Sequence, residues 1–348
     1  MKDKRKPLGQ VSRRDFLSAA AAAGAISTIK FASFARSSSS GAIFTTPVHR
    51  SKFAGVQIGT ITYSFRDLDG GIENVLKACV DSGVSSIELM PQGVETYLGA
   101  PNPPEGLGGY GGPPPRGFQR KPLTAEQQAA RDKYDEELKA WRLSVPMSKY
   151  VALRKMFNEA GVDIHIVKFQ ASRWSSDKEI DYAFKAAKAL GAKGISEELN
   201  EDAARKLGPI AARNGMYAIF HNHMQFAEPG FSYDPFIEIS PAVMFNFDAG
   251  HFFGSTGLHP NTIIDKYHDR IMSVHLKDKT GPNTTPPNAN QVWGQGEMPM
   301  EDVLLNIRDK KYPIYCDIEL EYDVPAWSNS VKEVKTCLKY ARQILLCM

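Results

Sequence analysis

The chain has 348 residues, of which 42% are hydrophobic and 23% are charged, and its formal net charge is +3. This length suits one large domain and is short for two complete ones. Part of the positive excess lies within residues 2–14, so the remainder of the chain has a net charge close to zero. This composition gives no indication of the strongly basic surface that nucleic-acid binding requires.

The N-terminal segment has the pattern of a twin-arginine export signal. A basic start leads into Arg13 and Arg14, and an Ala-rich apolar stretch follows over 19–29. We expect residues 1–35 to be this signal and 36–52 a linker, which predicts a periplasmic or otherwise exported protein. The apolar stretch is too short to span a bilayer, so no stable membrane anchor is expected. A basic amphipathic first helix is the alternative interpretation.

Residues 53–348 alternate short β-branched runs with amphipathic stretches, which indicates a parallel sheet with helical crossovers. Eight strands are predicted, the number of a (β/α)8 TIM barrel of the α/β class, over residues 56–63, 86–90, 163–169, 194–198, 217–223, 244–248, 272–277 and 314–319. Helices are predicted over residues 72–82, 149–160, 178–190, 202–214, 260–268, 300–310 and 330–345, and a weaker one over 232–239.

A long insertion over residues 91–147 follows the second predicted strand. Gly and Pro dominate 99–115, which should lack regular structure. Residues 124–141 predict a polar helix opened by a capping box of Thr124 and Gln127. Without the insertion and the export segment about 240 residues remain, close to the roughly 250 of a barrel. Because the insertion follows the C-terminal end of a strand, we expect it on the catalytic face, as a substrate lid or a contact in a homo-oligomer.

Ionisable residues recur at the carboxyl ends of the predicted strands, where barrel enzymes build their active sites. A single buried histidine is most often a core residue, but recurrence at successive strand ends predicts a shared site. Carboxylate and imidazole ligands without a thiolate favour one divalent ion, with Mn²⁺, Mg²⁺, Co²⁺ and Zn²⁺ all admissible. The residues concerned are Glu88, Glu197, Glu198, His221, His223, Asp248, His251, His275, Lys277, Glu319 and Glu321.

These motifs resemble the xylose-isomerase-like barrel superfamily, which includes sugar isomerases and epimerases, inosose dehydratase and 3-keto-glycoside-processing barrels. The resemblance rests on the Asp-x-x-His of Asp248 and His251, on the His-x-Lys-Asp that begins at His275, and on Glu319, and it covers about residues 53–345. It implies a divalent metal ion, Mn²⁺ first, with Asp248, His275 and Glu319 as ligands. It also implies a substrate contact for His251.

The fifth strand departs from the pattern of the family. Epimerases of the family have a glutamate there that is both ligand and base, whereas this chain has His221, Asn222 and His223. Either His221 takes that place or Glu198 reaches in from the neighbouring strand. Since adjacent strand residues face opposite sides, Glu197 and Glu198 cannot both point inward, and we favour Glu198 as the ligand.

The resemblance implies metal polarisation of a sugar carbonyl while a base removes the adjacent proton. We expect Glu319 to be base and ligand, with His223, His251 and Lys277 as further catalytic groups. The first expectation is a sugar isomerase or epimerase acting on a non-phosphorylated sugar or keto-sugar. The alternative is a lyase or dehydratase, because His221 or His223 offers a general acid for elimination from a keto-sugar or 3-keto-glycoside.

The expected partner is a small-molecule carbohydrate. No P-loop or similar phosphate cradle is recognisable in the sequence, and export also argues against a phosphorylated substrate. A non-catalytic carbohydrate-binding barrel is the alternative from another class. DNA repair, known elsewhere in the superfamily, would need more histidines and a basic groove, so no nucleic-acid partner is expected.

Overall fold

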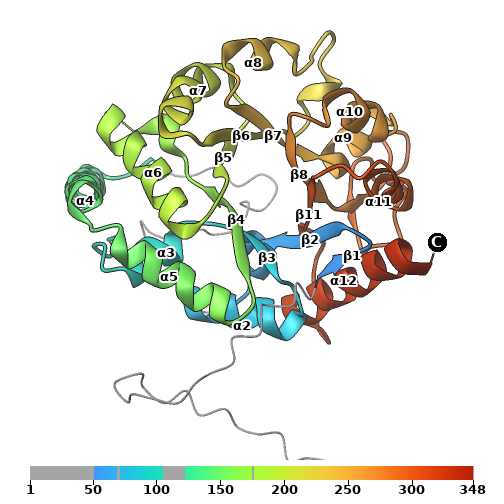
Figure 1. Ribbon diagram of the computed structural model, residues 1–348, viewed down its shortest axis with the longest axis horizontal. Helices are drawn as coiled ribbons and strands as arrows, with labels where there is room; N and C mark the ends of the chain where they lie inside the picture. Colours follow the sequence, from blue (N-terminus) through green and yellow to red (C-terminus); the bar gives the residue numbers. More distant parts are fainter. Residues whose placement is uncertain (1–50, 69–70, 105–121, 175, 348) are drawn as a thin grey trace, which may run out of the picture. The chain divides into compact units, whose positions relative to one another are not determined.

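The structure is a computed structural model that describes residues 51–68, 71–104, 122–174 and 176–347. The predicted export signal, most of the predicted linker and residues 105–121 of the insertion lie outside the described residues. Eight parallel strands form a closed barrel with helices around it, which confirms the predicted fold (Figure 1).

The barrel strands pair in chain order, and the last pairs with the first to close the ring. A short strand, β1 (Lys52–Phe53), pairs antiparallel with β2. Each barrel strand ends within two residues of its predicted bounds. The barrel strands are β2 (Val56–Ile61), β3 (Ser86–Leu89), β4 (Asp163–Lys168), β5 (Gly194–Glu198), β6 (Tyr217–His221), β7 (Val243–Asp248), β8 (Ile271–Leu276) and β11 (Tyr315–Ile318).

Most surrounding helices were predicted. They are α2 (Ile72–Ser82), α5 (Ser148–Glu159), α6 (Asp177–Leu190), α7 (Glu201–Asn214), α8 (Asp234–Ile239), α10 (Asn261–Tyr267), α11 (Met300–Asp309) and α12 (Ser330–Cys347). Short 3-10 turns η1 (Thr62–Phe65), η2 (Ala171–Arg173) and η3 (Gln225–Ala227) follow three of the strands. Within the described ranges, no helix has both the length and the apolar character of a membrane span.

Among the described residues, two helices were not predicted, α3 (Gln92–Tyr97) and α9 (Ala249–Thr256). Helix α9 starts directly at the end of β7, where the Asp248 carboxylate caps it by accepting a hydrogen bond from the backbone N–H of His251 at 2.7 Å. It has only eight residues and no charged one, which is too short for hydrophobic periodicity to mark it.

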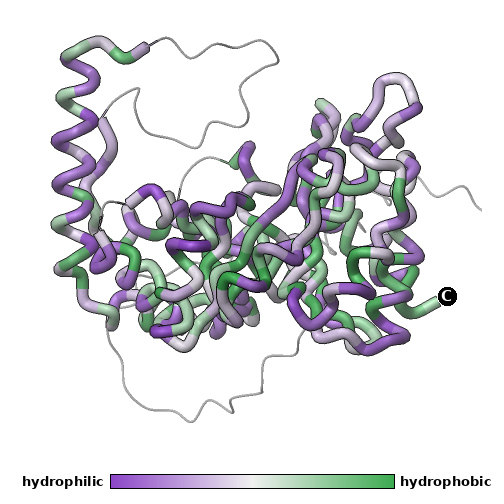
Figure 2. The backbone as a smooth tube through the Cα atoms, turned by 90° about the horizontal axis from the view of Figure 1, so that it is seen from above, coloured by the Kyte–Doolittle hydropathy of each residue, from purple (hydrophilic) through white to green (hydrophobic). Residues whose placement is uncertain are grey.

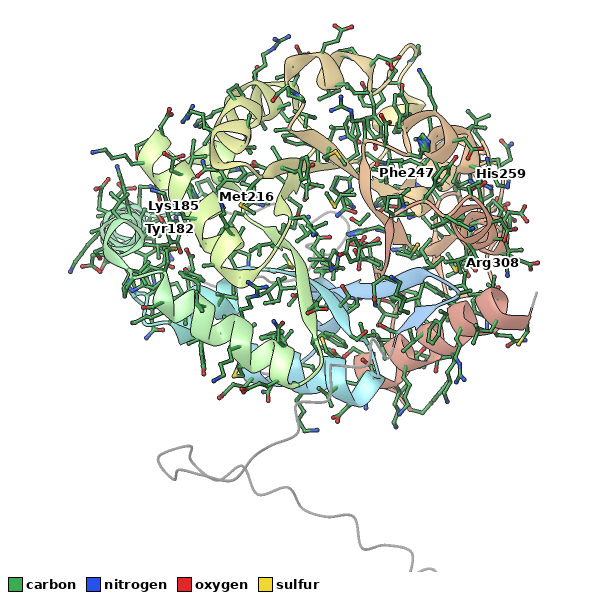
Figure 3. The ribbon with its side chains drawn as sticks, in the orientation of Figure 1. Tyr182, Lys185, Met216, Phe247, His259 and Arg308 are labelled. Carbon is green, nitrogen blue, oxygen red and sulfur yellow. The ribbon has the colours of Figure 1, made fainter. Side chains whose placement is uncertain are left out.

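The C-terminal half of β7 shows how the barrel separates polar side chains inside it from an apolar shell, whereas Met244 earlier in the strand belongs to a small apolar cluster. Phe247, labelled in Figure 3, packs against Phe226 and Phe252 of the surrounding layer. Its neighbours Asn246 and Asp248 instead contact groups from other strands, inside the barrel. This is the two-residue alternation of a strand, and it aims the polar residues of the strand ends at one another.

The described part of the insertion contains two helices, α3 and α4 (Ala125–Ser144). The predicted capping box of Thr124 and Gln127 is confirmed. Helix α4 is seen end-on in Figure 1 and lengthwise in Figure 2, where its mostly hydrophilic length extends beyond the barrel. Near its C-terminal end, Arg142 forms ion pairs with Glu95 of α3 and with Glu179 of α6, and the second pair fastens α4 to the barrel helices.

Candidate metal centre

The pairing register of the strands brings the polar strand ends together. Asp248 of β7 is the register partner of His275 of β8, and Glu198 of β5 is the partner of His221 of β6. Because all eight strands are parallel and the barrel is closed, their carboxyl ends meet at one rim. Residues far apart in the chain therefore reach one point.

Four buried residues, His221, Asp248, His275 and Glu319, could hold one metal ion, since each offers a ligand atom within 4.8 Å of the others. His275 Nδ1 lies 2.6 Å from Glu319 Oε2, and His221 Nε2 lies 3.2 Å from Asp248 Oδ2. The distance from His221 Nε2 to Glu319 Oε2 is 3.8 Å. The group has the mixed imidazole and carboxylate chemistry of a catalytic metal site.

Unsatisfied polar atoms indicate that these residues fit a metal ion. Both ring nitrogens of His221 and the Oδ2 atom of Asp248 are buried and have no hydrogen-bond partner. Leaving such an atom unpaired costs about 1–3 kcal/mol. A divalent ion would satisfy His221 and Asp248 together, and the two-imidazole, two-carboxylate set suits borderline ions of the first transition row.

Lys277 lies next to this group. Its Nζ is 2.8 Å from both Asp248 Oδ2 and Glu319 Oε2 and 2.9 Å from Glu321 Oε2. The contact with Asp248 is an ion pair without hydrogen-bond geometry, which is why that oxygen remains unsatisfied. Burial opposes the charge of Lys277, but the surrounding carboxylates outweigh it and raise the pKa of the ammonium well above its usual value. The lysine therefore stays protonated.

The carboxylates are held ionised. Burial alone would raise the pKa of Asp248, but electrostatic interaction with His251, with the positive charge of Lys277 and with His221 holds that pKa well below its usual range. For Glu319, Lys277 and His275 likewise overcome burial and hold the pKa well below normal. Both groups are permanent anions and suit a cation as ligands.

The pKa values of His275 and His251 are shifted in opposite directions. Burial opposes protonation of His275, yet the charges of Glu319 and Glu88 raise its pKa to about 9. For His251, burial lowers the pKa well below 6.5, and the positive charge of Lys277 adds to it. Its Nε2 lies 3.2 Å from Lys277 Nζ, so the neutral ring accepts a hydrogen bond from the ammonium.

A second set of residues forms the outer part of the site. His223 is 48% exposed, and its Nε2 is 2.7 Å from Glu198 Oε2. The other oxygen of Glu198 lies 2.8 Å from Lys168 Nζ. His221 Nδ1 faces Glu198 Oε2 at 3.4 Å, too far for a good hydrogen bond. Glu197, next in the chain, points away and accepts from the backbone N–H of Ser172 at 3.0 Å.

The structure thus brings together most of the residues singled out from the sequence. His221, Asp248, His275 and Glu319 form the buried group, with Lys277 and His251 beside them. Glu198 is not one of these four, but it lies near His221 and His223, and these three form a second set of residues that could hold a metal ion. Glu88 was noted at a strand end but given no role, and it contacts His275 Nε2 at 2.7 Å. Its only sequence signal was a carboxylate at the end of a buried strand.

Residues 192–343 match the family model described as "Xylose isomerase-like TIM barrel". Relatives in sequence are inosose dehydratases. The enzyme of Clostridium perfringens is 26% identical over 167 residues, which cover 43% of this chain and 54% of that enzyme. The enzyme of Clostridium beijerinckii is 26% identical over 221 residues, which cover 56% of this chain and 69% of that enzyme. This chain therefore spans only about half the length of the first of these relatives.

Solved structures have the same fold. A sugar phosphate isomerase/epimerase from Parabacteroides distasonis aligns with a TM-score of 0.54 at 18% identity, covering 86% of this chain and 99% of its own. The probable 3-DHS dehydratase involved in petrobactin synthesis from Bacillus anthracis aligns with a TM-score of 0.53 at 12% identity, covering 82% and 98%. At such identities the likeness shows the fold alone. The chain thus has the xylose isomerase-like TIM barrel fold, and inosose dehydratases are among its homologues.

Proposed function

We propose that this protein is a metal-dependent enzyme that removes the proton beside the carbonyl of a non-phosphorylated keto-sugar and then eliminates a β-substituent. The observation that carries this proposal is the half-exposed His223, backed by Glu198, at the same rim as the buried His–Asp–His–Glu group. Homology to inosose dehydratases supports elimination over epimerisation.

The metal ligands in this proposal are His221, Asp248, His275 and Glu319. An ion held by them would act as a Lewis acid on the carbonyl of the substrate. Two imidazoles suit Mn²⁺, Co²⁺ or Zn²⁺ better than Mg²⁺, and Mn²⁺ is the first to test. Glu198 faces the far nitrogen of His221, so we assign it the orientation of His221, in place of the ligand role expected from the sequence.

We assign proton transfer to His223. With Nε2 bonded to Glu198, its Nδ1 is left for a substrate, where an imidazole can serve first as general base and then as general acid. His223 takes the α-proton and passes it to the leaving oxygen. The C–H and C–O bonds break, a C=C bond forms, and water or an alcohol leaves. Glu319, whose pKa is held low, suits a ligand better than a base.

Lys277 and His251 complete the site. The Lys277 ammonium lies 2.8 Å from Glu319 Oε2 and 3.2 Å from His251 Nε2. A fixed positive charge at this place stabilises the negative charge that develops on the substrate oxygen when the α-proton leaves. His251, held neutral, accepts from the ammonium and orients it.

An isomerase or epimerase is the second candidate, because it shares the proton abstraction. Such a reaction needs another group to return the proton at a different carbon or face. Glu321 is the observation in its favour, since this carboxylate is 19% exposed and lies 2.9 Å from Lys277 Nζ at the same rim.

The test is incubation of the protein with Mn²⁺, Co²⁺, Zn²⁺ or Mg²⁺ and a panel of free sugars, inososes and 3-keto-glycosides in D₂O, followed by NMR. We expect loss of the α-proton signal together with an eliminated product. An epimer that keeps all its substituents would support the second candidate. A metal-loaded protein that never exchanges an α-proton would refute both and favour a carbohydrate-binding barrel.

The variant His223→Ala should lower turnover by about 10²–10⁴-fold, the usual contribution of a general acid–base group. His259→Ala is the matched control, because His259 is 40% exposed and is likewise paired with a carboxylate, Asp302, at 3.1 Å. Equal activity of the two variants would remove His223 from the mechanism.

We also propose that residues 1–35 export the protein through the twin-arginine route. Replacing Arg13 and Arg14 with lysine should retain the protein in the cytoplasm, as measured by cell fractionation. Unchanged export of this double variant would contradict the proposal.

A further inference from the structure

We propose that Glu88 of β3 is a positioning residue that holds the imidazole of His275 from the side opposite the metal centre. The inference rests on the metal centre proposed above and extends it, since Glu88 is not among the four ligands. Glu88 comes from the second strand of the barrel and His275 from the seventh, so their contact crosses the barrel interior.

The two ring nitrogens of His275 contact two different carboxylates. Nδ1 lies 2.6 Å from Glu319 Oε2, and Nε2 lies 2.7 Å from Glu88 Oε2. The two nitrogens of an imidazole point away from each other, so an ion bound by Nδ1 is out of reach of a group at Nε2. His221 Nε2 is 3.8 Å from Glu319 Oε2, which places the other ligands on the Nδ1 side. Glu88 is therefore behind the ring.

Glu88 is itself firmly held. Its side chain is fully buried, and its Oε2 atom accepts a hydrogen bond from Asn246 Nδ2 at 2.7 Å. The oxygen of the Asn246 amide accepts from Ser273 Oγ at 2.7 Å, which fixes the direction of the amide. The hydroxyl of Ser196 donates to the other oxygen of Glu88. A buried carboxylate is costly unless it is paired, and here both oxygens have donors.

This arrangement has a direct consequence for a ligand histidine. A carboxylate that accepts the Nε2–H of His275 fixes the tautomer whose free lone pair is on Nδ1, and it fixes the ring plane. It also makes Nδ1 a stronger donor to a metal ion. Loss of such a partner typically weakens metal binding by roughly 10–100-fold.

The experiment is calorimetric titration of the chelator-treated full-length protein with Co²⁺, together with its visible absorption spectrum. Glu88→Gln keeps the size of the side chain and should weaken Co²⁺ binding by roughly 10–100-fold and shift the absorption bands. Glu197→Gln is the matched control, since this buried carboxylate binds Ser172 and points away from the site. It should leave affinity and spectrum as in the wild type.

Each outcome separates this inference from the proposed function. Absence of Co²⁺ binding by the wild-type protein would overturn both. Equal affinity and spectrum for wild type and Glu88→Gln would overturn the role of Glu88 alone. Complete loss of binding in a folded Glu88→Gln protein would make Glu88 a ligand and also overturn the positioning role. Should this variant fail to fold, Ser196→Ala, which removes one donor to Glu88, must still weaken binding; unchanged affinity would refute the proposal.

Discussion

The ammonium of Lys277 lies 2.8 Å from Asp248 Oδ2, on the same carboxylate oxygen that His221 Nε2 approaches to 3.2 Å. A cation of the protein itself therefore competes for an atom of the proposed metal centre. Two unit positive charges about 4 Å apart repel each other by about 4 kcal/mol at an effective dielectric constant of 20. Metal affinity and the position of Lys277 should be coupled.

The variant Lys277→Met should consequently bind Mn²⁺ at least about tenfold more tightly, which corresponds to ~1.4 kcal/mol, and should be catalytically inactive. Calorimetric titration of the chelator-treated protein measures the affinity. Lys279→Met is the control, because that buried lysine lies on the following short strand β9 (Asp278–Lys279) and donates to Asn290 Oδ1 at 2.8 Å instead. Weaker Mn²⁺ binding by Lys277→Met would mean that the lysine supports the centre.

The metal-free protein should be less stable at alkaline pH. The pKa of His275 is raised from 6.5 to about 9 by Glu319 and Glu88, against the effect of burial. Stability from this protonated ring is complete below pH 6.5 and is lost as pH rises toward 9, on the order of 3 kcal/mol in total. Thermal unfolding of chelator-treated protein at pH 6 and pH 9 checks this, and equal midpoints would contradict it.

At acid pH, folding stability should change with pH in the opposite direction and fall as the pH is lowered. Burial opposes ionisation of Glu88, but His275 outweighs it and lowers the pKa from 4.5 to about 2. Its contribution is present above pH 4.5 and lost as pH falls toward 2. We expect Glu88→Gln to flatten the dependence of the unfolding midpoint on pH at both ends, because Glu88 and His275 are partners. An unchanged pH profile in this variant would show that the pair does not control stability.

Arg142 should be the residue that fastens the insertion helix. Its Nε lies 2.8 Å from Glu95 Oε1, its Nη1 lies 2.9 Å from Glu179 Oε1, and its guanidinium lies over the ring of Trp174 at 4.0 Å. Tyr182, labelled in Figure 3, also donates to Glu95. Arg142→Met removes the only cation paired with these two nearly buried carboxylates among the described contacts and should cost about 3–5 kcal/mol of unfolding free energy.

Arg131→Met is the matched control for this prediction. Arg131 is on the same helix and pairs with Asp135 at 3.2 Å, but both side chains are about half exposed. An exposed pair of this kind contributes about 0–1 kcal/mol. Urea unfolding of both variants measures the difference, and equal losses would show that the Arg142 cluster does not hold α4.

The thiols should differ sharply in reactivity. Burial raises the pKa of Cys79 to about 12 and raises the pKa of Cys316 and Cys337 as well. Because the thiolate is the reactive form, only the exposed Cys347 of the four should react with iodoacetamide at pH 8 in the folded protein. Mass spectrometry should find one modified cysteine before denaturation and four after it. Labelling of Cys316 in the folded state would contradict the buried core.

The alternation of β7 made part of the site predictable. Asp248 follows the apolar Phe247 at a strand end, and in a parallel barrel this position faces the rim. The same local signal singled out His275 and Glu319. No local signal marks the contact between Glu88 and His275, which are 187 residues apart in the chain. Nor did periodicity mark α9, which starts at the residue after Asp248.

The sequence by itself determined the eight strands and the chemical character of their ends, because both depend on residue type and two-residue spacing. Only the tertiary structure decided that His221 joins Asp248, His275 and Glu319 in one group and that Glu198 meets His221 from the neighbouring strand. The physical reason is barrel closure. Pairing of β11 with β2 and the register of each strand pair depend on packing around the whole ring, and they fix which side chains meet across it.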